Sequence, residues 1–176
     1  MAIITIPAPE LQINFSKIIQ KIRETYLQEA LSKTMERINL LKLDKELNEY
    51  VPENYLKSLA KLGLRGEIMY SVPYLLETNP FLLGYYRLLL GFSQKEFYSA
   101  AFGVSAFKTM ETKGILLERT KNKLSALCKA LINSAIALSD GIGIENMSSK
   151  LLDDLTLLTI GPQLRGGANV EKEQRG

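Results

Sequence analysis

Apolar residues recur at steps of three and four along most of this 176-residue chain, which is the spacing that places them on one face of an α-helix. The first stripe contains Leu11, Phe15, Ile18, Ile22 and Tyr26, and it predicts an amphipathic helix that continues to about residue 38. Later stripes, bounded by Gly, Pro or capping residues, predict helices near 43–51, 52–63, 79–92, 118–143 and 146–158. The chain is therefore expected to be mainly α.

Two segments depart from this helical spacing. In LRGEIMYSVP the residues Ile68, Tyr70 and Val72 alternate with their neighbours, which predicts a short strand or extended segment near 66–73. Residues 161–176 hold four of the twelve glycines, and the pair Gly161–Pro162 predicts an abrupt helix end. We therefore expect a helical domain over 1–160 and a glycine-rich loop over 161–176 that leads into a further domain.

The composition suits one globular domain and excludes several kinds of chemistry. With 46% hydrophobic residues and a formal net charge of +3, the chain can bury a core and is not strongly basic. The absence of histidine excludes Ser–His and Cys–His nucleophile pairs and His-ligated zinc. Cys128 is the single cysteine, so we expect a core residue in a reduced, cytoplasmic protein. No apolar run approaches the roughly 20 residues of a membrane-spanning helix, and no membrane association is expected.

The stretch GFSQKEFYSAAFGVSAFKTMETKG, residues 91–114, predicts two short helices joined at Gly103. Ser93 and Glu96 have the spacing of a capping box at the start of the first helix. This text resembles repressor-type helix-turn-helix proteins, whose second helix enters the major groove of DNA. It departs from them in being one residue longer before Gly103 and in carrying the bulky Tyr98 where a small residue is expected. A non-enzymatic helix-turn-helix regulator is therefore one alternative.

A longer resemblance extends over nearly the whole chain. The block LRGEIMYSVPYLLETNPFLLGYYRLLLGFSQKEFY, residues 64–98, looks like the corresponding block of XcyI-type restriction endonucleases. The block LTIGPQLRGGANVEKEQRG, residues 157–176, is similar to the segment in which those proteins pass from a helical N-terminal region toward their catalytic part. PELQ…F near the N-terminus and TMETKG also fit.

This resemblance implies a type II restriction endonuclease of a restriction-modification system, which cuts a GC-rich palindrome in double-stranded DNA (CCCGGG for the type that names the family) with Mg²⁺. It also implies an α/β nuclease core similar to the PD-(D/E)XK class, in proteins much longer than this chain. The chain thus looks like their truncated, helical N-terminal portion, with the catalytic core expected beyond residue 176 and the fragment alone inactive. A palindromic site implies a two-fold homodimer of the full-length enzyme.

Metal-dependent hydrolysis of a phosphodiester needs acidic groups that hold Mg²⁺ and a lysine that positions water. The attractive (D/E)-x-K match is Glu111 and Lys113, in a helical context and not on a strand, where residues i and i+2 share a face. They are weak catalytic candidates, so we expect no catalytic residue in this chain and assign no metal ligand. Glu67 is another acid of interest, expected to be a solvated carboxylate or a local cap.

The candidates for DNA contact are basic side chains in the helix pair, at the helix start that follows it, and beside Gly166–Gly167. They are Lys108, Lys113, Arg119, Lys121, Lys123 and Arg165. The commoner explanation for the cluster of Arg119, Lys121 and Lys123 is a solvated start of a helix. A third alternative is an all-α interaction domain with no nucleic-acid role, which salt-dependent binding to duplex DNA would distinguish from the other two.

Overall fold

The computed structural model describes the backbone of residues 3–175 and the side chains of residues 3–162, and within these limits it contains helices and no strand. The mainly α fold is therefore confirmed. No helix in the described part is both long enough and apolar enough to cross a membrane. In chain order the helices are α1 (Glu10–Tyr26), α2 (Gln28–Met35), α3 (Leu40–Tyr50), α4 (Glu53–Lys61), η1 (Gly66–Ile68), α5 (Pro73–Thr78), α6 (Leu82–Leu89), α7 (Gln94–Phe97), η2 (Ser105–Phe107), α8 (Lys108–Lys113), α9 (Glu118–Lys121), α10 (Leu124–Ile142), η3 (Ile144–Asn146) and α11 (Ser149–Arg175).

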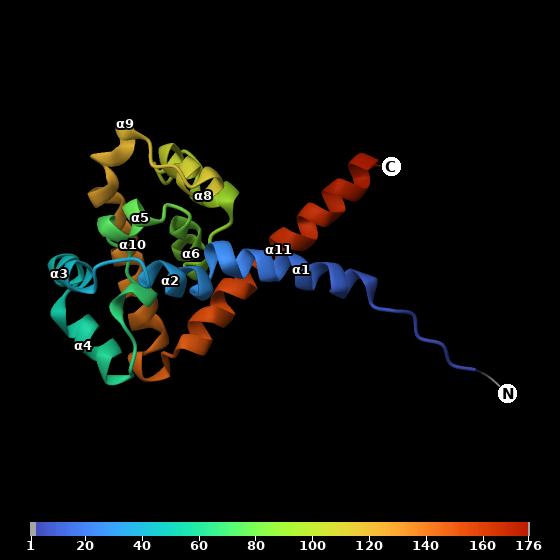
Figure 1. Cartoon of the computed structure of the whole chain (residues 1–176), viewed down its shortest axis with the longest axis horizontal. Coiled ribbons are helices and arrows are strands. Elements are labelled where there is room, and N and C mark those ends of the chain that lie inside the picture. The colour runs from blue at the N-terminus through green and yellow to red at the C-terminus, as the bar shows by residue number, and fades with distance from the viewer. Residues whose placement is uncertain (1–2, 176) are drawn as a thin grey trace.

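Helix α6 forms the centre of the fold, with α1, α2, α5, α8 and α11 packed around it (Figure 1). All eight of its residues, LLGYYRLL, are buried, as expected of a helix that is apolar or aromatic apart from Arg87. The hydroxyl groups of Tyr85 and Tyr86 are buried with the rings, and they donate to the backbone carbonyls of Ile68 (2.5 Å) and Glu67 (2.6 Å). Gly84 lets α1 approach, because a Cβ there would lie 2.7 Å from the Tyr26 ring.

The segment predicted as a strand near 66–73 is instead the short helix η1 followed by a buried connection. Met69, Tyr70, Ser71 and Val72 are all buried, so the alternation in sequence does not separate a core face from a solvent face. A strand needs a neighbouring strand to pair with, and residues 3–175 provide none. The segment runs through the core instead, held by the hydroxyl groups of Tyr85 and Tyr86.

The long helix predicted to reach residue 38 is divided at Leu27, which has extended backbone angles (φ −103°, ψ −168°). Leu27 is fully buried against Leu88 and Ile160 in a small second core. Redirecting the chain at this residue lets α2 bury Ala30 and Leu31, while no residue of α1 itself is fully buried. Sequence periodicity does not detect such a break, because both helices keep the same apolar spacing.

Helix α11 continues past Gly161 and Pro162 to Arg175, so its backbone differs from the loop predicted over 161–176. A proline inside a helix costs about 3 kcal/mol, which disfavours continuation without forbidding it. The turns before Pro162 are anchored by buried Leu152, Thr156 and Ile160, on one face of the helix. Figure 1 shows α11 crossing α1 near this point, after which both helices extend away from the body on the same side.

Candidate nucleic-acid interface

Arg87 of α6 and Glu111 of α8 form an ion pair inside the core, with side chains only 3% and 1% exposed. Arg87 Nη2 lies 2.6 Å from Glu111 Oε1, and Arg87 Nε lies 3.0 Å from both carboxylate oxygens. Arg87 Nη1 also donates to the carbonyl of Phe92 at 2.7 Å. Because an unpaired charge is very unfavourable in a core, this pair fixes α8 against α6.

Two further side chains donate to the Glu111 carboxylate. Gln94 Nε2 lies 3.0 Å from Oε1, and the Tyr98 hydroxyl lies 2.5 Å from Oε2. Burial, and then the charge of Glu111, raise the pKa of Tyr98, so the hydroxyl stays protonated and donates. The Tyr26 hydroxyl of α1 donates to the backbone carbonyl of Glu111 at 3.1 Å. Glu111 therefore joins α1, α6 and α8 to the segment that contains α7.

The two charges of the ETK sequence point in different directions. Glu111 faces the core, whereas Lys113 is exposed, because residues two apart on a helix are separated by about 200°. The Glu111 carboxylate already accepts hydrogen bonds from three side chains. Among the residues that the structure describes, no group of three or more His, Cys, Asp or Glu side chains could hold a metal ion. The arrangement around Glu111 is therefore structural, and the weak catalytic prediction for this pair gains no support from the geometry.

Residues 91–114 do not form two regular helices. The capping box of Ser93 and Glu96 is confirmed, but α7, which it begins, is only four residues long. Turns follow to Gly103, and the second part consists of the short helices η2 and α8, which end at Gly114 (φ +68°). Tyr98, the bulky departure from the repressor pattern, supplies the hydroxyl that Glu111 binds. This geometry lacks both the supporting helix and the long recognition helix of a helix-turn-helix.

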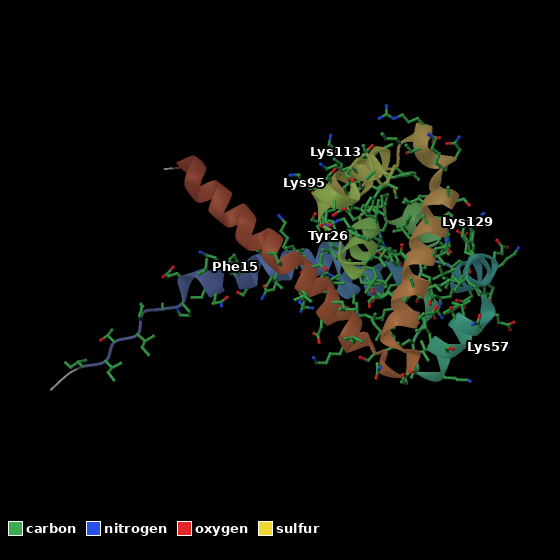
Figure 2. The ribbon with its side chains drawn as sticks, turned by 180° about the vertical axis from the view of Figure 1, so that it is seen from behind. Phe15, Tyr26, Lys57, Lys95, Lys113 and Lys129 are labelled. Atoms are coloured by element: carbon green, nitrogen blue, oxygen red, sulfur yellow. The ribbon has the colours of Figure 1, made fainter. Side chains whose placement is uncertain are left out.

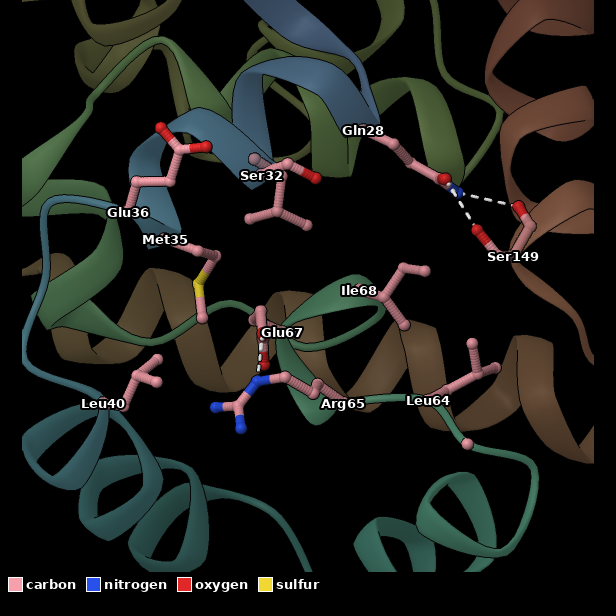
Figure 3. A pocket seen from close by; sticks show the side chains of 12 residues that line it. Gln28, Ser32, Met35, Glu36, Leu40, Leu64, Arg65, Glu67, Ile68 and Ser149 are labelled. Carbon is pink, nitrogen blue, oxygen red and sulfur yellow. Dashed lines mark hydrogen bonds and ion pairs between the residues drawn. The ribbon is translucent and has the colours of Figure 1, made fainter.

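A pocket of about 430 Å³ lies between α2, residues 63–68 and the start of α11 (Figure 3). Glu67 lines it, and its carboxylate is buried and accepts from Arg65 Nε at 2.6 Å, so the expectation of a solvated carboxylate is wrong. Glu36 also lines the pocket. Two carboxylates with one guanidinium on otherwise largely apolar walls make this pocket unsuitable for a phosphate group.

A positively charged surface surrounds α8 and α9, which lie at one end of the molecule (Figure 1). We define the basic surface as the exposed side chains of Lys95, Lys108, Lys113, Arg119, Lys121 and Lys123. None of the six is in an ion pair within the described part of the chain. Figure 2 shows Lys95 and Lys113 together at one edge, with Lys57 at the far end of the molecule. Five of the six predicted DNA-contact residues are thus exposed on or next to α8 and α9, and Lys95, which sequence reasoning missed, is exposed on α7.

The start of α10 strengthens the positive potential of this surface. Lys123 occupies the N-cap position, where no side chain caps the free N–H groups of the first turn. Arg119 and Lys121 belong to α9, directly before it. Cations at a helix N-terminus oppose the helix dipole. An anion bound at the same place is stabilised both by the dipole and by these cationic side chains. This arrangement suits the binding of a phosphate group from outside.

Arg165, the sixth predicted residue, lies on the backbone of α11, and its side chain is outside the described residues. The glycine loop in which it was expected is helical there. The structure therefore does not place Arg165 relative to the basic surface.

The family model described as XcyI restriction endonuclease matches residues 16–176. The chain is 50% identical over 175 residues to the type II restriction enzyme Cfr9I of Citrobacter freundii and to the type II restriction enzyme XcyI of Xanthomonas campestris pv. cyanopsidis. In each case the match covers 98% of this chain and 52% of the relative, so the chain spans about half the length of these relatives. No solved structure matches it.

The family match covers most of the chain, including both the α6 core and residues 91–114. It confirms the resemblance drawn from residues 64–98 and 157–176. The chain belongs to the XcyI restriction endonuclease family.

Proposed function

We propose that this chain is the N-terminal, DNA-binding part of a type II restriction endonuclease that recognises and cleaves a GC-rich palindromic site in double-stranded DNA. The basic surface binds the phosphate backbone and sets the orientation of the enzyme on the duplex. The full-length enzyme acts as a homodimer in the cytoplasm, where each subunit meets one half of the palindrome. Cleavage belongs to the part of the enzyme that corresponds to the unmatched half of the relatives.

The observation that carries this proposal is the distribution of charge between Gly91 and Lys123. Six basic side chains are exposed there against two exposed acids, Glu96 and Glu118, while the third acid, Glu111, is turned inward and neutralised by Arg87. A net charge of only +3 for the chain conceals this local concentration. Phosphate contacts supply most of the sequence-independent affinity of DNA-binding proteins, and they position the protein for base recognition.

The described residues do not fit the Mg²⁺ that the family implies. A Mg²⁺ site for phosphodiester hydrolysis needs carboxylates that converge with free lone pairs. No group of three or more such ligands is found in the described part of the chain, and Glu111 is already committed to Arg87, Gln94 and Tyr98. We therefore assign no step of the hydrolysis to residues 3–162.

The test is a titration of duplex DNA with this chain, followed by fluorescence anisotropy at several salt concentrations between about 50 and 200 mM. The duplexes contain CCCGGG or a permuted sequence of the same composition. We expect binding that weakens linearly with log salt. In the triple variant Arg119→Gln, Lys121→Gln, Lys123→Gln the log–log slope should fall by about 3, since each phosphate contact contributes roughly 1.

The matched control is Lys57→Gln, which removes one positive charge at the far end of the molecule (Figure 2). Lys57 makes only an exposed i,i+4 ion pair with Glu53, so the variant should fold and bind like the unmodified chain. Equal salt slopes for the triple variant and the unmodified chain would exclude the basic surface as the DNA contact. No binding by the unmodified chain at about 50 mM salt would favour the interaction-domain alternative.

A further inference from the structure

The N-terminal part of the chain exposes an unusual concentration of large apolar side chains. Of the twelve large hydrophobic residues that are exposed in the described part, six lie between residues 3 and 18. Ile3, Ile4 and Ile6 precede α1 and are 86–88% exposed, and on α1 Leu11 is 61% and Ile18 43% exposed. A concentration of exposed apolar side chains of this kind marks an interaction site, because leaving it in water is unfavourable.

The exposed part of α1 continues a stripe whose other end is already buried. Leu11, Phe15, Ile18, Ile22 and Tyr26 lie within about 80° of one another around the helix. Ile22 and Tyr26 pack against the second core formed by Leu27, Leu88 and Ile160. Leu11 and Ile18 have no such partner in the described residues, and Figure 2 shows Phe15 on the part of α1 that extends beyond the body. We define the arm surface as Ile3, Ile4, Ile6, Leu11, Phe15 and Ile18.

The direction of α1 is fixed relative to α11, which passes beside it. Arg23 of α1 pairs with Asp153 of α11, with 3.2 Å between Nη1 and Oδ2. Leu157 and Ile160 of α11 pack in the same second core as Ile22 and Tyr26. Beyond this crossing both helices extend from the same side of the body (Figure 1). A polypeptide segment joined to the far end of α11 would therefore begin on the side where the arm surface is exposed.

We propose that the arm surface is the docking surface for the other half of the enzyme, the part that corresponds to the unmatched portion of Cfr9I and XcyI. These relatives are about twice as long as this chain, so the partner exists in the family as a comparable length of polypeptide. Interfaces between domains of one chain typically bury on the order of 600–1,500 Å², and a hydrophobic interface holds the two parts together more firmly than a polar one. The inference rests on the proposed function, because it assumes that the unmatched half carries the nuclease core.

The experiment uses this chain with an affinity tag, coexpressed with an untagged polypeptide that comprises the unmatched half of Cfr9I. We expect the untagged half to copurify with the unmodified chain. In the variant Ile18→Lys its retention should fall at least about tenfold, because the ammonium group cannot be buried in an apolar contact without a large loss. The matched variant Gln20→Lys, on the opposite face of α1 and exposed, should retain the half fully.

Circular dichroism of both variants establishes that each is folded, and light scattering of the chain alone reports its oligomeric state. A dimer of the chain that Ile18→Lys dissociates would overturn the proposal in favour of a second copy as the occupant. Equal retention by Ile18→Lys and Gln20→Lys, or no retention by the unmodified chain, would also overturn it. DNA binding by the same samples tests the proposed function separately, because the exposed part of α1, where Phe15 lies, is away from Lys95 and Lys113 (Figure 2).

Discussion

Replacement of Glu111 by alanine should greatly lower the free energy of unfolding of this domain, although Glu111 lies in a motif that resembles a nuclease site. The substitution leaves Arg87 charged and buried, with Phe92 as its remaining hydrogen-bond acceptor among the contacts described above. Breaking one side of a buried ion pair costs about 3–5 kcal/mol. A domain of this kind is stable by roughly 5–15 kcal/mol, so the loss is a large fraction of the total.

Urea denaturation followed by circular dichroism measures this loss directly. A free-energy change near 4 kcal/mol and a denaturant slope near 2 kcal/mol/M would lower the unfolding midpoint by about 2 M. Lys113→Ala is the matched variant within the same motif, and its exposed side chain should contribute less than about 0.5 kcal/mol. The double variant Arg87→Met, Glu111→Leu should lose less stability than Glu111→Ala alone, since it removes both charges together.

Two results would refute this reasoning. If the free energy of unfolding of Glu111→Ala is within about 0.5 kcal/mol of that of the unmodified chain, the ion pair does not hold α8 on α6. If the double variant is no more stable than Glu111→Ala, the loss does not come from an uncompensated Arg87 charge. In either case Glu111 would again be a candidate for a role outside the core.

Two further predictions concern groups that burial protects. The pKa of Cys128 is raised from 9.0 to about 12, chiefly by burial, so the native thiol should react with a disulfide reagent at pH 8 at least about a hundredfold more slowly than the thiol in urea. Burial likewise raises the pKa of Tyr70 from 10.0 to about 12. The unfolded chain therefore releases the Tyr70 and Cys128 protons at lower pH than the native chain does. As a result, the free energy of unfolding should fall as the pH rises from about 9 to 12. A stability that is flat across this range in urea titrations would contradict the burial of these groups. Gly84→Ala should lower the free energy of unfolding by more than about 1 kcal/mol, because its Cβ would lie 2.7 Å from the Tyr26 ring and 3.1 Å from Glu111 Cγ. The control Gly141→Ala should not destabilise the chain, because its Cβ position is open and its backbone is ordinary helix.

The positions of most helices and several helix ends were predictable from the sequence, because they depend on interactions between residues close in sequence. The apolar stripes of α10 and α11 and the capping box at Ser93 operate within one or two turns of chain. The break at Leu27 was not predictable in the same way. It depends on Leu88 and Ile160, which are distant in sequence, and extended backbone at one residue leaves the apolar period on either side unchanged.

The candidate interface was predictable in part for a related reason. Lys108, Lys113, Arg119, Lys121 and Lys123 are close in sequence, and each is exposed on or next to the short helices α8 and α9. Lys95 was missed because its exposure beside Lys113 depends on how α7 folds back toward α8 (Figure 2). That arrangement is set by Gln94 and Tyr98 binding Glu111, and no local pattern in the sequence indicates three side chains converging on one carboxylate.

The difference between a catalytic motif and a structural one is here a matter of backbone conformation. On a β-strand, an acid and a lysine at i and i+2 share one face and can reach the same metal ion. On α8 the same spacing turns Glu111 into the core and Lys113 toward solvent. Burial then gives the two charges separate consequences. The acid is neutralised by Arg87 and stabilises the fold, so it does not offset the positive potential outside, and Lys113 adds its full charge to the basic surface. The three residues that resemble a nuclease site thus leave a net positive charge on the surface that we propose binds the DNA backbone.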